Sequence, residues 1–139
     1  MTDTQNNSLL PGYEATVVTR TNMTDDALKV LIEKLYGVVK SFKGEVLETE
    51  DWGKKRLAYN IQKEVRGHYT YFVFNGTQGV VEELERNMRI QENVLRYLTV
   101  KLEDEFDFPK FKKNKELARE RIEEERKFAE KREFSRDRY

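Results

Sequence analysis

Residues 51–74 read DWGKKRLAYNIQKEVRGHYTYFVF, and this stretch decides how the chain folds. Apolar and polar residues alternate through most of it, as they do in a β-strand that buries one face. Three consecutive cations, Lys54, Lys55 and Arg56, interrupt the alternation directly after Gly53. Because successive strand side chains point to opposite faces, this run places charge on both faces. We therefore expect a two-stranded hairpin that extends beyond the hydrophobic core.

The same stretch predicts where the hairpin turns. One strand runs from Glu45 to about Ile61, the tip covers residues 63–67, and a returning strand follows over His68–Phe74. Gly53 permits a bulge or a strong local twist in the first of these strands.

A strand and a helix precede the hairpin. Tyr13–Arg20 alternates as a strand and is rich in β-branched residues. Asn22 or Thr24 can cap a helix that Gly44 ends. The strand turns Tyr13, Ala15 and Val17 to one face, and the helix has an apolar stripe of Leu28, Leu31, Ile32, Leu35, Val39 and Phe42.

A second helix and a last strand follow the hairpin. Residues 75–79, NGTQG, form a turn, and Val81, Leu84 and Met88 recur at helical spacing. Val94–Leu102 alternates again. The predicted order is therefore β-α-β-β-α-β, which is the α+β ferredoxin-like split fold: a four-stranded antiparallel sheet with both helices on one face. The other face needs a partner or must tolerate water.

Charge divides the chain into unequal parts. The composition is 37% hydrophobic and 37% charged, well above the ~25% charged residues of an ordinary globular domain. Residues 1–107 hold 18 acidic and 14 basic side chains, whereas residues 108–139 hold 8 and 12. We predict a flexible arm over residues 1–12, a domain over 13–102, and a charged extension over 103–139 that is partly helical or disordered.

The extension starts with a linker, since Pro109 discourages a helix from crossing it. Its apolar residues Leu117, Ile122 and Phe128 are five and six positions apart and form no continuous stripe.

The composition argues against several classes of protein. There are no cysteines, so disulfides, thiolate metal sites and thiol nucleophiles are excluded. Met1–Pro11 lacks the basic start and apolar core of a signal peptide, and no apolar run approaches the ~20 residues of a membrane helix. We expect a cytoplasmic protein.

Nothing in the chain indicates catalysis. The single histidine, His68, has no nucleophile beside it in a recognisable pattern, and the glycines do not form a phosphate-binding motif. Glu48, Glu50 and Asp51 are typical of a solvated strand edge and not of a metal site. We predict no enzyme activity, no cofactor, no metal site and no small-molecule substrate.

The hairpin instead indicates a nucleic-acid contact. It carries five cations: Lys54, Lys55, Arg56, Lys63 and Arg66. Cations bind phosphate, and nearby aromatic rings can stack on unpaired bases; the rings here belong to Tyr59, Tyr69 and Tyr71. Protection of a sheet edge against aggregation is the other interpretation of the cations.

Gly53–Ile61, GKKRLAYNI, resembles the signature of the bacterial small-subunit ribosomal protein six family. The resemblance continues in Tyr13-Glu14, in the aromatic strand after Gly67, and in Leu84–Lys101. It covers roughly residues 13–102 and implies a ferredoxin-like domain that binds the central domain of small-subunit (16S) ribosomal RNA as a heterodimer with small-subunit ribosomal protein eighteen. The extension inherits no role from it.

Two further cations join the predicted RNA contacts. Arg89 and Arg96 lie in the segment MRIQENVLR and either contact phosphate or pair with surface acids such as Glu85 and Glu92. With them, the predicted contact residues are Lys54, Lys55, Arg56, Lys63, Arg66, Arg89 and Arg96.

Two alternatives share the same fold. A general single-stranded RNA module needs an aromatic residue directly after Arg66-Gly67, but His68 stands there. A small acylphosphatase-like enzyme needs an anion-binding loop after the first strand, where this chain has the acidic segment TRTNMTDD.

Overall fold

The computed structural model describes residues 9–137, with side chains as far as residue 133. It divides into two compact units, which meet between Phe106 and Asp107. The first is the predicted α+β domain, and the second is a single helix.

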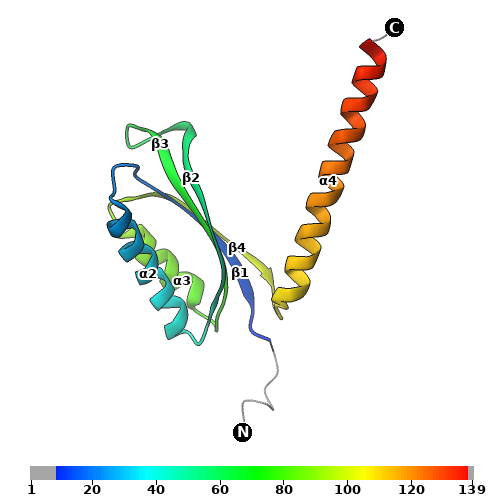
Figure 1. The fold of residues 1–139 in the computed structure, drawn as a ribbon. Coiled ribbons are helices and arrows are strands. Elements are labelled where there is room, and N and C mark those ends of the chain that lie inside the picture. The colour runs from blue at the N-terminus through cyan, green and yellow to red at the C-terminus, as the bar shows by residue number, and fades with distance from the viewer. Residues whose placement is uncertain (1–8, 138–139) are drawn as a thin grey trace. The chain divides into compact units, whose positions relative to one another are not determined.

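The first unit has the element order β-α-β-β-α-β (Figure 1). Its elements are β1 (Gly12–Thr19), α2 (Asp25–Ser41), β2 (Val46–Ile61), β3 (Glu64–Asn75), α3 (Val80–Arg89) and β4 (Val94–Glu103). The strands form one antiparallel sheet in the order β2-β3-β1-β4. Both helices cover the same face of this sheet (Figure 1). The ferredoxin-like split fold is confirmed.

The hydrophobic core lies between the helices and the sheet. Its buried residues come from both, and they are Ala15, Val17, Leu31, Leu35, Val39, Phe72, Phe74, Val80, Leu84, Met88 and Val94. Burial of such side chains provides most of the free energy that holds the layers together. A smaller cluster, Val18, Leu57 and Leu95, lies on the opposite face, because Val18 follows Val17 in the strand.

Helix α2 begins as predicted but ends differently. Thr24, not Asn22, is the N-cap, and its Oγ1 accepts a hydrogen bond from the Ala27 amide at 3.1 Å. At the other end Lys43 has the left-handed φ of 58°, a conformation expected of Gly44. The Gly44 amide donates to the Val39 carbonyl at 3.0 Å, so Gly44 closes the helix one position later.

The hairpin tip is shorter than predicted. Residues 64–67 belong to β3, and the turn consists of Gln62 and Lys63, with φ of 49° and 68°. Two consecutive positive φ values are typical of the two-residue turns that match the twist of a hairpin. The expectation of a five-residue tip was wrong because two residues with positive φ close the hairpin, and the charged residues from Glu64 onward pair in β3.

The ends of the domain lie slightly outside the predicted bounds. Of the predicted arm, residues 1–8 lie outside the described residues. Leu10 accepts a hydrogen bond from the Phe106 amide at 3.0 Å, and Phe106 is only 3% exposed. The compact unit thus extends to Phe106 because this ring packs on the sheet after β4 ends.

The second unit is α4 (Phe108–Asp137). Pro109 lies in its first turn, where a missing amide costs no hydrogen bond, so the helix begins at Phe108 and continues through the proline. The linker expected around Pro109 is therefore helical from Phe108. The Asp107 carboxylate accepts from the Lys110 amide at 3.2 Å.

Candidate nucleic-acid interface

A bulge in β2 sets the direction of the hairpin cations. Gly53 has a left-handed φ of 79°, and the pairing with β3 shifts between Asp51 and Gly53, leaving Trp52 as the extra residue. Asp51 Oδ1 accepts from the Gly53 amide at 2.8 Å and lies 2.7 Å from His68 Nε2. The hydrogen bond to His68 lowers the pKa of the Asp51 carboxyl. Because of this extra residue, the side chains of β2 beyond the bulge point to the opposite faces from those that regular alternation would give them.

Three hairpin cations lie together on one face. Lys54 is opposite His68 in the pairing, and Arg56 is opposite Arg66. We call Lys54, Arg56 and Arg66 the cationic face. All three are exposed, and Arg66 Nη2 donates to the Lys54 carbonyl at 3.3 Å. The hairpin extends past the ends of α2 and α3 (Figure 1), so this face points to solvent although it continues the helix-covered side of the sheet.

Lys55 lies on the other side of the hairpin, the open face of the sheet. Its ammonium is 5.5 Å from the centroid of the Trp52 ring and 6.0 Å from that of Tyr69. An ammonium at these distances is attracted by the ring faces. Lys55 is therefore held by aromatic rings, apart from Lys54 and Arg56.

Tyr71 does not offer the stacking surface that was predicted for it. It is 4% exposed, and Trp52 stacks on its ring with centroids 5.0 Å apart. Its hydroxyl donates to Glu14 Oε2 at 2.7 Å. Burial, and then the neighbouring Glu14 carboxylate, raise the pKa of Tyr71. The strand pattern indicated its face but not the extra residue Trp52 that covers it.

Tyr59 and Arg96 form a pair across the open face. Arg96 Nη1 donates to the Tyr59 hydroxyl at 3.0 Å, and the guanidinium carbon lies 5.8 Å from the ring centroid. The partner of Arg96 is thus the aromatic residue Tyr59 and not the surface acid that the alternative interpretation expected. Tyr59 is 62% exposed, so much of its ring is accessible.

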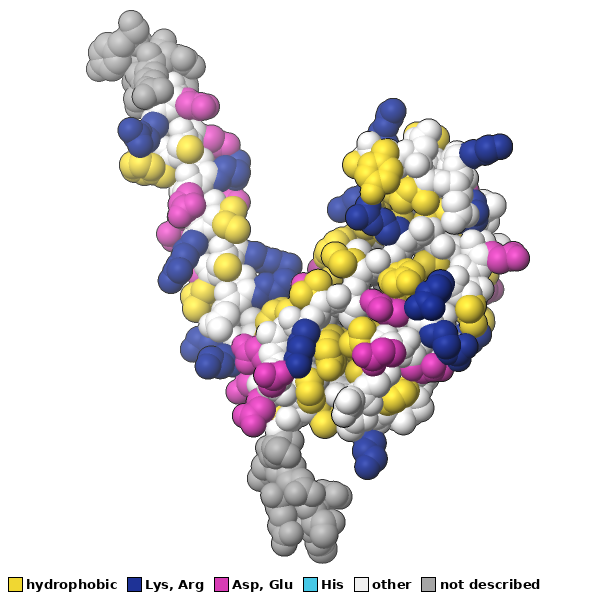
Figure 2. Space-filling model, turned by 180° about the vertical axis from the view of Figure 1, so that it is seen from behind, with side chains coloured by type: hydrophobic (Ala, Val, Ile, Leu, Met, Phe, Trp, Pro, Cys, Tyr) yellow, Lys and Arg dark blue, Asp and Glu magenta, His cyan; other side chains and the backbone are white. Residues whose placement is uncertain are grey.

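The open face also carries exposed apolar side chains. Leu98 and Val100 of β4 are 61% and 40% exposed, and Trp52 is 39% exposed. Gly67 allows Val18 and Leu57 to approach, since a Cβ there would lie 2.4 Å from Val18 Cγ1. Figure 2 shows hydrophobic side chains on the surface of the domain between basic and acidic ones.

Arg20 is a site residue that the sequence analysis missed. Its guanidinium donates to Gln62 Oε1 at 2.5 Å and to Glu64 Oε1 at 3.1 Å, and its Nε donates to the Glu92 carbonyl at 3.4 Å. It therefore holds the hairpin tip, where Lys63 lies, against the loop before β4. Nothing local in the sequence signals this role, because its partners are 42 to 72 residues away.

Arg89 lies at the end of α3 and is exposed. With Arg20 and Gln62 it lines a surface hollow of about 390 Å³. Arg89 and Lys63 therefore lie near the same end of the sheet.

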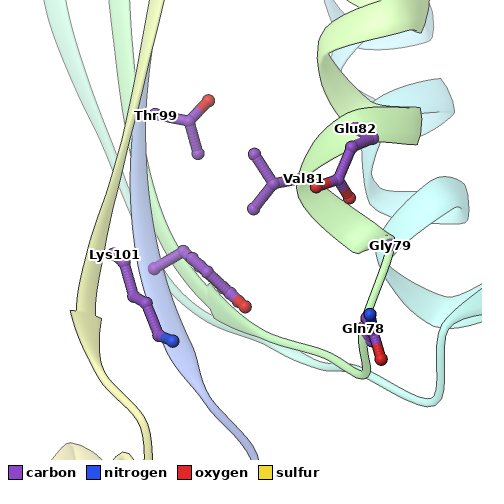
Figure 3. Close-up of a pocket in the computed structure, with 7 residues that line it drawn as sticks. Gln78, Gly79, Val81, Glu82, Thr99 and Lys101 are labelled. Atoms are coloured by element: carbon purple, nitrogen blue, oxygen red, sulfur yellow. The ribbon is translucent and has the colours of Figure 1, made fainter.

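A second hollow, of about 370 Å³, lies between β4 and the start of α3 (Figure 3). Thr99 and Val81 point toward each other across it. Its charged residues are Glu82 and Lys101, and Lys101 is already paired with Asp104. Among the described residues, no group of three or more acidic, histidine or cysteine side chains is placed to hold a metal ion. No helix within residues 9–137 is long and apolar enough to cross a membrane.

A split β-α-β-β-α-β domain with a cationic hairpin and an uncovered sheet face belongs to the class of small binding modules. Comparison with known proteins identifies the kind. The sequence profile described as "Ribosomal protein S6" matches residues 12–101. The chain belongs to the ribosomal protein S6 family.

Individual relatives agree with this assignment. "Small ribosomal subunit protein bS6" of Geobacter sulfurreducens is 44% identical over 70% of this chain and 83% of its own length. The protein of the same name from Pelagibacter ubique is 42% identical over 65% of this chain and 74% of its own length.

A solved structure of 30S ribosomal protein S6 from Thermotoga maritima supports the fold. It superposes with a TM-score of 0.63 at 24% identity, covering 78% of this chain and 98% of its own.

Family membership decides between the classes considered above. The chain belongs to a family of structural ribosomal proteins, so it is not an enzyme, and the acylphosphatase-like alternative is set aside. Membership of the ribosomal protein S6 family also sets aside the alternative of a general single-stranded RNA module. The resemblance seen in the GKKRLAYNI segment is confirmed.

Proposed function

We propose that this protein acts in the cytoplasm as a structural component of the small ribosomal subunit. In this proposal it binds the central domain of 16S ribosomal RNA together with small-subunit ribosomal protein eighteen. The observation that carries the RNA contact is the pairing of Arg56 directly opposite Arg66. Like charges at opposed strand positions destabilise a sheet, so their presence needs a compensating anion.

Phosphate is the anion that fits the cationic face. Within the described part of the chain, Lys54, Arg56 and Arg66 have no acidic partner at ion-pair distance. Two guanidinium groups and an ammonium lie on one exposed ribbon, and these are the groups that form charge-assisted contacts with the phosphates of a nucleic-acid backbone. Such contacts position the protein and do not read bases.

The open face is the surface we assign to the protein partner. Helices cover only one side of the sheet, and the other side exposes Trp52, Tyr59, Leu98 and Val100. A group of exposed aromatic and aliphatic side chains on a rigid sheet is typical of a protein contact. Lys55 and Arg96, held on aromatic rings, would lie at its border.

The charge balance predicts that the two contacts cooperate. Residues 1–107 have an acidic excess of four charges, so long-range attraction between the domain and RNA is small. We expect weak binding of the isolated protein to a central-domain RNA fragment and much tighter binding when protein eighteen is present. The measurement is an RNA-binding titration at several salt concentrations, with and without that partner. Tight, specific binding by the isolated chain at moderate salt would contradict the proposed cooperation.

A further inference from the structure

Helix α4 is the one helix or strand that the structure describes within its unit, so no other described element of that unit packs against it. It has 30 residues, and its exposed large apolar side chains are Leu117, Ile122 and Phe128, at 45%, 65% and 64%. Helices that bind protein grooves present anchors at i, i+3, i+4 and i+7. Leu117 and Phe128 are eleven residues, or about three turns, apart and share one side of the helix, whereas Ile122 lies on another side. These three side chains therefore form no continuous row of anchors for a protein groove.

Charge is what α4 offers, and it is unevenly distributed. Residues 110–121 contain six basic and two acidic side chains, whereas residues 122–137 contain five and six. Nearly all the positive excess of the extension therefore lies in the first half of the helix. Figure 2 shows basic and acidic side chains along α4, with single hydrophobic ones between them.

The two halves also differ in how their charges are used. In the second half, Arg126 is bridged to Glu123 and Glu130, each at 2.6 Å. In the first half, as far as the structure describes the chain, no acidic side chain lies at ion-pair distance from Lys110, Lys112, Lys113, Arg119 or Arg121. In net charge, the second half has one more acidic than basic side chain, whereas the first half has four more basic than acidic ones.

One side of the first half carries a continuous row of cations. Lys112, Lys115 and Arg119 are spaced i, i+3 and i+7, which places them on one side of an α-helix over about two turns. Lys115 lies over the Phe111 ring, with its ammonium 5.8 Å from the ring centroid. Ile122 continues the row at i+10 from Lys112.

We propose that this row, which we call the α4 basic row, binds the phosphate backbone of ribosomal RNA. The inference rests on the proposed function, since it takes the RNA to be that of the small subunit. It adds a second RNA contact, on a different unit of the chain from the cationic face. The contact recognises charge and not base sequence.

The test removes the row while keeping the helix and the whole chain. The variant is Lys112→Gln, Lys115→Gln and Arg119→Gln; glutamine has a helix propensity close to that of lysine and arginine. Its matched control is Lys127→Gln, Lys131→Gln and Arg132→Gln, which removes three cations from the half in which acidic side chains outnumber basic ones. Circular dichroism checks that both variants keep their helix content.

Binding to 16S RNA is then measured as a function of salt, with protein eighteen present. Each lost phosphate contact lowers the slope of log K against log salt by about 0.7 to 0.9, so we expect the row variant to lose about 2 to 3 in slope. The control should lose less than about 1. Equal losses in both variants would overturn the assignment to this row, since net charge alone would then explain them.

Two more outcomes separate this inference from the proposed function. If the row variant binds like the parent while Lys54→Glu with Arg56→Glu binds weakly, α4 is a solvated spacer and only this inference falls. If the unmodified chain does not bind the RNA even with protein eighteen present, both fall. A photo-crosslinking amino acid at Ile122 provides an independent readout in assembled subunits: crosslinks to RNA support the row, and crosslinks only to protein overturn it.

Discussion

At the scale of single residues, the pairing of Arg56 with Arg66 lowers the stability of the fold and favours the proposed RNA contact. The two guanidinium groups oppose each other across β2 and β3. Such a pair lowers the stability of the domain alone and raises its attraction for phosphate. A change that relieves the repulsion should therefore leave the fold intact and weaken assembly.

The double variant Lys54→Glu with Arg56→Glu tests this link. The carboxylate introduced at position 56 would face Arg66, and opposite charges at paired positions contribute roughly 0.2–1 kcal/mol; other surface effects stay within roughly 0.5 kcal/mol. We expect a melting temperature equal to or slightly above that of the parent, with weaker incorporation into small subunits. The control is Lys29→Glu with Lys34→Glu on the exposed side of α2, which makes the same charge change. A much lower melting temperature would show that Lys54 and Arg56 are structural.

Asp51 gives the domain a dependence on pH. The carboxylate accepts from the Gly53 amide and is hydrogen-bonded to His68, and the pKa of Asp51 is lowered in the folded state. A lowered folded pKa stabilises the fold at pH values above the unfolded pKa of about 3.9. This contribution is lost as the pH falls through the lower folded value.

We therefore expect Asp51→Asn to melt below the parent at pH 7 and the gap to narrow as the pH falls below about 3.9, since the amide resembles the protonated carboxyl. Thermal melts across this range measure the difference. Glu33→Gln, on the exposed side of α2, is the control and should show no such convergence. A constant gap at all pH values would show that the charge of Asp51 does not stabilise the bulge.

At the scale of elements, the bulge in β2 decides which face each hairpin cation occupies. If Trp52 took a regular place in the pairing and no bulge formed, Lys55 would lie on the same face as Asp51. Lys54 and Arg56 would then lie on the open face. Gly53 adopts the left-handed conformation that the bulge requires, and glycine does so at little cost in conformational free energy. One glycine thus separates the proposed RNA contact from the proposed protein contact.

Replacement of this glycine should be costly. Gly53→Ala puts a Cβ on a residue with φ of 79°, and left-handed backbone costs an L-residue about 1–2 kcal/mol. The comparison is Gly37→Ala, in the exposed middle of α2 with nothing within 4 Å of the new Cβ, which should stabilise by about 1 kcal/mol. Denaturant unfolding measures both changes. If Gly53→Ala is neutral, the bulge does not depend on glycine.

At the scale of the whole molecule, the chain joins a mildly acidic domain to a basic helix. The domain has its own core, which ends with Phe106, and α4 forms a separate compact unit. The isolated stability of α4 is modest, because a solvated helix depends on pairs such as Arg126–Glu130, each worth about 0.2–0.5 kcal/mol. Its contribution should therefore appear in binding and not in folding.

A chain that ends at Asp107 should keep the melting temperature of the parent and dissociate from small subunits at lower salt. The removed residues include none of the core, and they carry a positive excess of four charges. Calorimetry and sedimentation of small subunits through a salt series measure the two quantities. A large fall in melting temperature would mean that α4 stabilises the domain, and an unchanged salt profile would mean that it does not touch the ribosome.

The sequence alone determined the architecture. Two local patterns were confirmed: the alternation in Tyr13–Arg20 and the helical spacing of Leu31, Leu35 and Val39. Both could be read from the sequence because the side chains that a strand or helix buries on one face recur at a fixed spacing. The family was also readable, since the GKKRLAYNI segment keeps the bulge glycine and the cations together in the chain.

The tertiary structure alone decided which of the predicted contact residues are exposed and able to contact a binding partner. Tyr71 is covered by Trp52, Lys55 lies on aromatic rings, and Arg20 holds the hairpin tip. Each of these contacts joins strands or loops that are distant in sequence, and one shifted residue in β2 reverses the face of every side chain beyond it. Local patterns show which face a strand buries, but contacts across strands depend on register, and register is set only when the strands are packed together.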